Sequence, residues 1–135
     1  MEYEIYNETA YNCKENLIVA VANFYKTDYE MMSLEAWNFF YEGKDNNKIG
    51  NGAFTRYDYL KKYHGIQVKE IFPKDGEEAL KIIKKELTSG NPIATYIDCY
   101  YCSWDFRNYR KHHKDHYCLI KDVLEDKLIL VDAIL

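Results

Sequence analysis

Apolar residues first gather in the run Leu17-Ile18-Val19-Ala20-Val21-Ala22, which has no polar position on any side. Such a run is typical of a helix buried all round, and we predict a helix over Cys13–Tyr25. Asn12 is the expected N-cap. Cys13 then lies in the first turn, where unpaired backbone N–H groups make the helix end positive. The pattern therefore predicts a buried helix with a thiol at its positive end.

The next part of the chain alternates between short helical patterns and turn residues. Five segments are expected: a helix over Leu34–Tyr41, a loop over 44–52, a helix over Thr55–Tyr63, a strand over Ile66–Phe72 and a helix over Gly76–Leu87. Gly65 and Pro73 are the expected stops of the third and fourth segments. The last helix has one apolar and one charged face, so it should lie on the outside of the fold.

After the break at Gly90-Asn91-Pro92 the pattern changes to strands. They are expected over Ile93–Tyr101, His116–Leu124 and Leu128–Asp132, with a tight turn at 125–127. Helices first and antiparallel strands second indicate the α+β class. A length of 135 residues suits one core, so we expect a single domain over 1–135.

The long loop over 103–116 is dense in aromatic and basic residues, and loops of this length are usually functional. Aromatic residues in and beside it are the expected wall of a substrate cleft: Tyr100, Tyr101, Trp104 and Tyr109. Four basic residues form a second group: Arg107, Arg110, Lys111 and Lys114. This basic cluster would suit an acidic or phosphate-bearing partner, such as a phosphopantetheinyl carrier protein.

Composition and charge exclude several classes of function. A net charge of −4 and a pI near 5.6 argue against nucleic acid as the main partner. The longest apolar run is far below the ~20 residues that span a bilayer, and the first residues lack the features of a signal peptide. We therefore expect a cytoplasmic protein with no membrane segment, in which the four cysteines are free thiols, ligands or catalysts rather than a disulfide framework.

Three residues form a candidate nucleophilic site: Cys13, His116 and Asp132. His116 begins one strand of a predicted hairpin and Asp132 ends the other, so their side chains should meet. A helix end and a nearby imidazole both favour the reactive thiolate of cysteine. The backbone N–H of Cys13 and the side chain of Asn7 are the expected donors to an oxyanion.

Other interpretations of these residues remain open. Cys13 is in phase with core positions of its helix and also suits an inert buried thiol, and a structural role suits His116 and Asp132 equally well. The pair Cys99 and Cys102, followed by His112 and His116, superficially matches a zinc site. We expect no metal, because a strand continuing to Tyr101 would point the two cysteines to opposite faces.

Several motifs together resemble a known family. They are Asn12-Cys13, Asn91-Pro92, Tyr96-Ile97-Asp98-Cys99-Tyr100-Tyr101, Tyr109, His113, His116-Tyr117-Cys118-Leu119-Ile120 and Val131-Asp132. Their order resembles the N-terminal domain of the butirosin biosynthesis protein H family, a papain-like group from antibiotic biosynthetic clusters. In this family a proline usually follows the aspartate, whereas Ala133 follows Asp132 here.

The resemblance implies a papain-like α+β fold with a catalytic triad of Cys13, His116 and Asp132. It also implies acyl transfer from the thioester of an acyl or peptidyl carrier protein to a small amine, as in amide-forming enzymes of nonribosomal thioamide antibiotic pathways. No cofactor is expected apart from the phosphopantetheine arm of the carrier. A cysteine peptidase or amidase of the same fold uses the same groups, and a non-catalytic interaction domain is the third alternative.

Overall fold

The computed structural model describes residues 2–4, 11–37, 39–42, 48–51, 55–125 and 127–132. The chain divides into two compact units. The larger unit contains Met1–Phe24 and Pro73–Leu135, and the inserted unit is Tyr25–Phe72. No helix among the described residues combines the length and the apolar character needed to cross a membrane.

The buried helix is α1, Cys13–Tyr25, and it has the predicted ends. Its start is closed by a reciprocal cap: the Glu15 backbone N–H donates to Asn12 Oδ1 at 3.0 Å, and the Asn12 backbone N–H donates to Glu15 Oε2 at 2.7 Å. Such a pair satisfies two backbone donors that a helix start leaves open. Cys13 is thereby fixed as the first helical residue.

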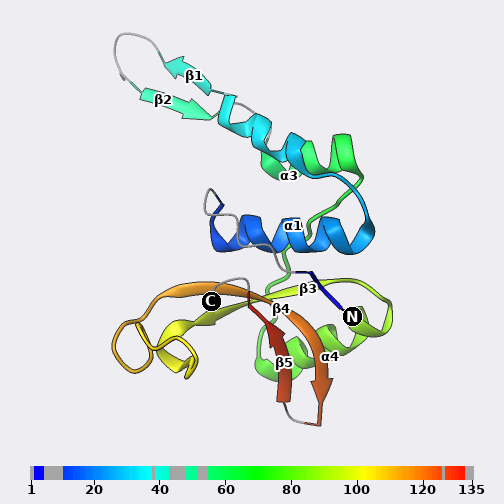
Figure 1. Cartoon of the computed structure of the whole chain (residues 1–135), viewed down its shortest axis with the longest axis vertical. Helices are drawn as coiled ribbons and strands as arrows, with labels where there is room; N and C mark the ends of the chain where they lie inside the picture. Colours follow the sequence, from blue (N-terminus) through cyan, green and yellow to red (C-terminus); the bar gives the residue numbers. More distant parts are fainter. Residues whose placement is uncertain are drawn as a thin grey trace. The chain divides into compact units, whose positions relative to one another are not determined.

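A three-stranded antiparallel sheet forms the rest of the larger unit's core, in the order β3-β4-β5 (Figure 1). Its strands are β3 Ile93–Asp98, β4 Asp115–Leu124 and β5 Lys127–Val131. Helices together with an antiparallel sheet confirm the α+β class. The strand predicted over Ile93–Tyr101 is too long, because the Asp98 carboxylate accepts the Tyr100 backbone N–H at 2.9 Å and starts the 3-10 helix η3, Cys99–Tyr101.

Helix α1 packs on one face of this sheet. Leu17 and Ala20 form a buried cluster with Leu119, and Tyr117 and Val131 pack against it. We call the side that carries Tyr117, Leu119 and Val131 the α1 face. Successive strand residues point to opposite sides, so His116 and Cys118 point to the other side, which we call the far face. This alternation decides which candidate residues lie together.

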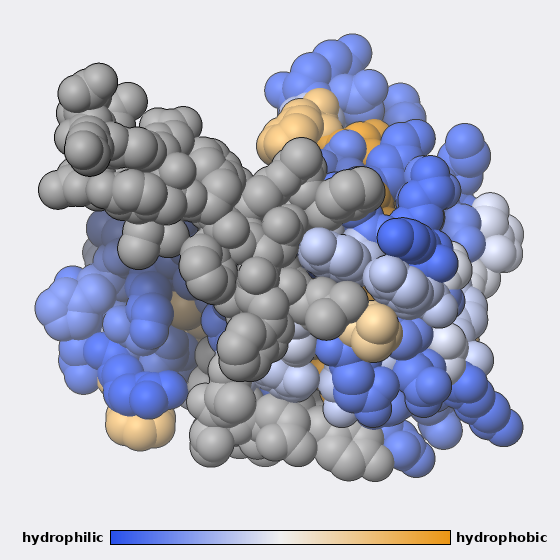
Figure 2. Space-filling model, turned by 90° about the horizontal axis from the view of Figure 1, so that it is seen from above, coloured by the Kyte–Doolittle hydropathy of each residue, from blue (hydrophilic) through white to orange (hydrophobic). Residues whose placement is uncertain are grey.

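The charged helix α4, Gly76–Thr88, agrees with the predicted helix and contacts β3. Asp75 caps it by accepting the Glu78 backbone N–H at 2.8 Å. None of its residues is fully buried, as expected for an outer helix. Hydrophilic residues dominate the described surface seen in Figure 2, where hydrophobic residues appear only in small separate groups.

The inserted unit differs most from prediction. Its elements are η1 Glu30–Trp37, β1 Phe39–Glu42, β2 Lys48–Asn51, α3 Arg56–Tyr59 and η2 Leu60–His64. The predicted helix over Leu34–Tyr41 is wrong, since a 3-10 helix ends at Trp37 and the aromatic run after it pairs as a strand. The predicted loop over 44–52 contains the partner strand β2.

The predicted strand over Ile66–Phe72 is also wrong, because those residues have no strand partner and form no regular element. The helix predicted over Thr55–Tyr63 is present as α3 followed by the π-helical turn η2. It ends at Gly65, whose φ of 69° is the left-handed conformation that glycine adopts without strain.

Candidate functional site

Two of the three predicted catalytic residues meet on the far face. His116 Nε2 and Asp132 Oδ1 lie 2.7 Å apart. His116 is near the start of β4, and Asp132 follows the last residue of β5, so the hairpin brings them together as the sequence predicts. Their side chains are only 7% and 16% exposed, respectively. We call His116 and Asp132 the buried pair.

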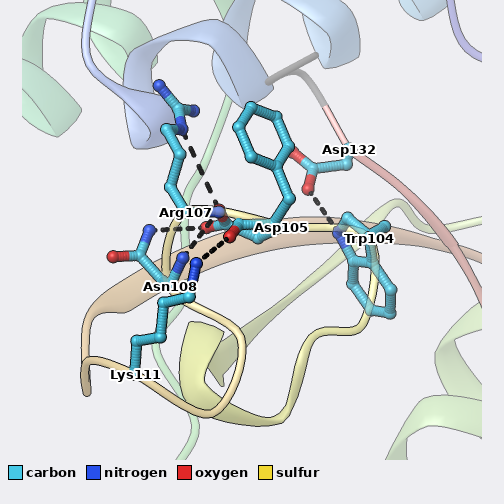
Figure 3. Close-up of polar contacts among 7 residues, drawn as sticks. Trp104, Asp105, Arg107, Asn108, Lys111 and Asp132 are labelled. Carbon is cyan, nitrogen blue, oxygen red and sulfur yellow. Dashed lines mark hydrogen bonds and ion pairs between the residues drawn. The ribbon is translucent and has the colours of Figure 1, made fainter.

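Trp104 also contacts this carboxylate. Its indole Nε1 donates to Asp132 Oδ2 at 3.1 Å, and the two side chains point toward each other in Figure 3. Asp132 therefore accepts from different groups through its two oxygens, which fixes the plane of its carboxylate. Trp104 is a predicted cleft-wall residue, and what the structure shows of it is the hydrogen bond that positions Asp132.

Three cysteines are buried and electrostatically unsuited to act as nucleophiles. Burial raises the pKa of the Cys118 thiol to about 12, with a smaller contribution from the nearby Asp132 carboxylate. Burial, followed by a hydrogen bond with Asp105, raises the pKa of Cys99 to about 11. The pKa of Cys102 is also raised, mainly by burial. Since the thiolate is the nucleophile, these three thiols are poor nucleophiles near neutral pH.

Cys13 differs from them because it is only partly buried. It lies in the first turn of α1, one and two turns before Leu17 and Ala20, which contact the sheet. Side chains with this spacing share one side of a helix, so Cys13 turns toward the α1 face. The structure thus joins His116 to Asp132 on the far face, and strand alternation directs the His116 ring away from the face on which α1 packs.

A second imidazole is held by a carboxylate on the side where α1 packs. His113 Nδ1 lies 2.6 Å from Asp98 Oδ2, and the side chains are 68% and 28% exposed. The Tyr100 ring stacks on the imidazole, with ring centroids 4.3 Å apart. The bond from His113, followed by that from the Tyr100 backbone N–H, lowers the pKa of Asp98 below its ordinary value. We call His113 and Asp98 the exposed pair.

The sheet geometry assigns the exposed pair to the α1 face. Asp98 is two residues after Tyr96, and Tyr96 packs edge-on against Tyr117 with ring centroids 5.7 Å apart. Residues two apart on a strand share a face. Lys14, in the first turn of α1, places its Nζ 5.4 Å from the centre of the same Tyr117 ring. The first turn of α1 and the exposed pair therefore share one side of the sheet.

His113 is not among the residues predicted to be catalytic, and only the family resemblance includes it. The signal was present in the sequence, because Asp98 ends a strand and His113 nearly begins the next, antiparallel one. Strands paired in this way return the chain to the same point, so residues flanking their connection meet. The longer predicted strand, ending at Tyr101, concealed this relation.

The four residues of the basic cluster are all exposed. Arg107 Nε lies 3.9 Å from Asp105 Oδ1, and Lys111 Nζ donates to the Phe106 carbonyl oxygen at 3.0 Å (Figure 3). The Asn108 side-chain amide donates a hydrogen bond to Asp105 Oδ2. This bond is the largest of the contacts that lower the pKa of the Asp105 carboxyl. The loop thus has an internal polar frame, with its cations on the outside.

The remaining predicted site residues have different positions. Tyr101 is exposed, and Tyr109 is half-buried beneath Arg110, whose guanidinium lies 5.3 Å from the ring centre. Asn7, the predicted oxyanion donor, lies outside the described residues.

No family model matches the chain, and no match was found among curated proteins or solved structures. The resemblance to the butirosin biosynthesis protein H family therefore stays a prediction.

Proposed function

We propose that this chain is a thiol enzyme that transfers an acyl group from a carrier-protein thioester to an amine through an acyl-Cys13 intermediate. The observation that carries the proposal is the exposed pair, an oriented imidazole on the side of the sheet against which the Cys13 helix packs. An imidazole oriented by a third group is the usual activator of a cysteine nucleophile. The buried helix on an antiparallel sheet also supports a papain-like arrangement.

The proposed reaction needs only one base. His113 takes the proton of Cys13, and the thiolate attacks the thioester carbonyl, so that a new thioester forms and the carrier thiol leaves with the proton. The amine then attacks the acyl-Cys13 carbonyl, the amide bond forms and the Cys13 sulfur leaves. The proton lost by the amine returns to Cys13 through the imidazole. Exchange of one thioester for another is nearly isoenergetic, so the favourable free energy of the overall reaction comes from amide formation.

The role of orienting aspartate belongs to Asp98 in this scheme. His113 uses Nδ1 to contact Asp98, so in this scheme Nε2 is the ring nitrogen that takes the Cys13 proton. The Cys13–His116–Asp132 triad predicted from the sequence is the competing assignment, and it needs the His116 ring to act across the sheet. Because the two histidines lie on different faces, single substitutions separate the two assignments.

The basic cluster supports a carrier protein as the acyl donor. Arg107, Arg110 and Lys114 are exposed in the segment between β3 and β4, which also carries His113 of the exposed pair. Carrier proteins present an acidic surface and a phosphate beside the thioester arm, so cations near the site would raise the association rate. We expect donor turnover to fall with added salt, since exposed charges are screened beyond about 10 Å at 0.1 M salt.

The test is intact mass spectrometry after incubation with an acyl-pantetheine thioester. Wild-type protein should gain one acyl mass that maps to Cys13, and added amine should remove it and yield the amide. Cys13→Ser should gain none, whereas Cys99→Ser, the matched control at a buried thiol, should behave as wild type. An unmodified wild type, or an adduct mapped to another cysteine, overturns the proposal. Loss of the acyl group to water at the same rate without amine indicates the peptidase or amidase alternative.

A further inference from the structure

The far face brings together three different metal-ligand types. One ligand atom each of His116, Cys118 and Asp132 lies within 4.8 Å of the other two. His116 and Cys118 are buried, and Asp132 is largely buried. We propose that this three-donor cluster binds a divalent metal ion of the zinc class. The inference does not depend on the proposed acyl transfer, because it concerns the opposite face of the sheet.

The spacing of the donors fits such an ion after small movements. Zinc bonds of about 2.0–2.1 Å to nitrogen and oxygen and about 2.3 Å to sulfur, at tetrahedral angles, separate neighbouring ligand atoms by roughly 3.3 to 3.6 Å. His116 Nε2 and Asp132 Oδ1 are now 2.7 Å apart. Opening this contact by about half an ångström and drawing the thiol inward would place all three donors around one centre.

The donor types and charges also favour zinc. Nitrogen, sulfur and carboxylate oxygen together suit a borderline-soft divalent ion rather than Mg²⁺ or Ca²⁺, which prefer oxygen. On binding, Cys118 gives up its thiol proton and forms a sulfur–metal bond. The two charges of the ion are then balanced by the Cys118 thiolate and the Asp132 carboxylate. A buried site that becomes neutral avoids the cost of an uncompensated charge.

Trp104 would act as a positioning residue for this site. Its indole N–H already holds Asp132 Oδ2, which leaves Oδ1 directed at His116. Outer partners of this kind orient metal ligands, and their removal typically weakens binding about 10- to 100-fold. The sequence motif Cys99-x-x-Cys102 does not supply the same arrangement, because the Cys102 thiol donates to the Asp98 carbonyl oxygen at 3.4 Å.

The experiment titrates chelator-treated wild-type protein with ZnCl₂ and, separately, with CoCl₂. We expect about one ion per chain, release of about one proton per ion, and a thiolate-to-cobalt absorption band. Cys118→Ser should lose that band, whereas Cys102→Ser, a buried thiol outside the cluster, should keep it. Trp104→Phe should weaken zinc binding about 10- to 100-fold.

A second measurement on wild-type protein covers the case in which Cys118→Ser does not fold. After mild unfolding in the presence or absence of zinc, alkylation followed by peptide mapping should show protection of Cys118 by zinc and none of Cys102. Absence of zinc binding at micromolar concentrations overturns the inference, as does a thiolate band that depends on Cys102 rather than Cys118. Reactivity of Cys13 toward an acyl thioester is measured separately, so failure of either proposal leaves the other standing.

Discussion

The exposed pair and the buried pair have nearly the same N···O distance but differ in their exposure to solvent. His113 and Asp98 are joined at 2.6 Å and are open to solvent, whereas His116 and Asp132 are joined at 2.7 Å beneath the loop that carries Trp104. A buried pair is rigid and poorly accessible, which suits a structural contact or an ion. An exposed pair keeps an oriented ring within reach of a substrate. Pairing of histidine with aspartate therefore does not identify a catalytic site until its accessibility is known.

Substitution of the histidines should produce the largest difference between the two pairs. If His113 is the base for Cys13, His113→Ala should lower the rate of acyl transfer about 10²- to 10⁴-fold, which is the usual contribution of a positioned base. Single-turnover measurements with an acyl-pantetheine thioester give this rate. His112→Ala, at the neighbouring exposed histidine, is the control and should leave the rate unchanged. A full loss in His116→Ala with a normal rate in His113→Ala would restore the triad predicted from the sequence.

Thiol reactivity should separate the two faces of the sheet. A pKa of about 12 against the ordinary 9.0 leaves Cys118 with roughly a thousandfold less thiolate at neutral pH. Iodoacetamide should therefore label Cys13 in the folded protein long before Cys118, Cys99 or Cys102, and all four should react after unfolding. Peptide mapping over time gives the order. Early labelling of Cys118 would show that the far face is open.

Stability should depend on the buried pair more than on the exposed pair. His116→Ala leaves the Asp132 carboxylate without one partner in a largely buried position, which should cost about 2 kcal/mol of unfolding free energy. His113→Ala should change that free energy much less, because water replaces the lost bond. Urea unfolding in the presence of a chelator measures both variants without a contribution from metal. Equal losses would mean that burial does not distinguish the pairs.

The smallest expected effect is the loss in acid of the stability that the exposed pair contributes. The pKa of Asp98 is lowered from 3.8, and the hydrogen bond with His113 is the largest cause. The folded state therefore favours the ionised carboxylate. The stability it contributes is full well above pH 3.8 and is lost as the pH falls through the lower folded-state pKa. The melting temperatures of wild type and Asp98→Asn should therefore converge in acid. A constant difference across this range would contradict the shift.

Local sequence patterns were sufficient to predict the elements whose hydrogen bonds join residues that are near in sequence. The apolar run after Cys13 predicted α1 with its correct ends, and the charged and apolar faces of 76–87 predicted α4. The meander of β3, β4 and β5 and the meeting of His116 with Asp132 also followed from the sequence, because a hairpin fixes which residues are opposite one another. In the inserted unit, by contrast, the aromatic residues at 39–41 suited both helix and strand, and pairing with β2 decided between them.

Patterns along the chain alone were enough to predict that a thiol begins a buried helix and that a histidine and an aspartate meet across a hairpin. The sheet face that each side chain occupies follows from long-range packing, because α1 packs against Leu119 and the strand then turns His116 and Cys118 the other way. It also revealed the exposed pair, since the capping of η3 by Asp98 ended a strand that its composition would have continued. In a regular stretch of strand such as 115–120, placing one residue fixes the faces of its neighbours, but nothing local specifies which face a distant helix will cover.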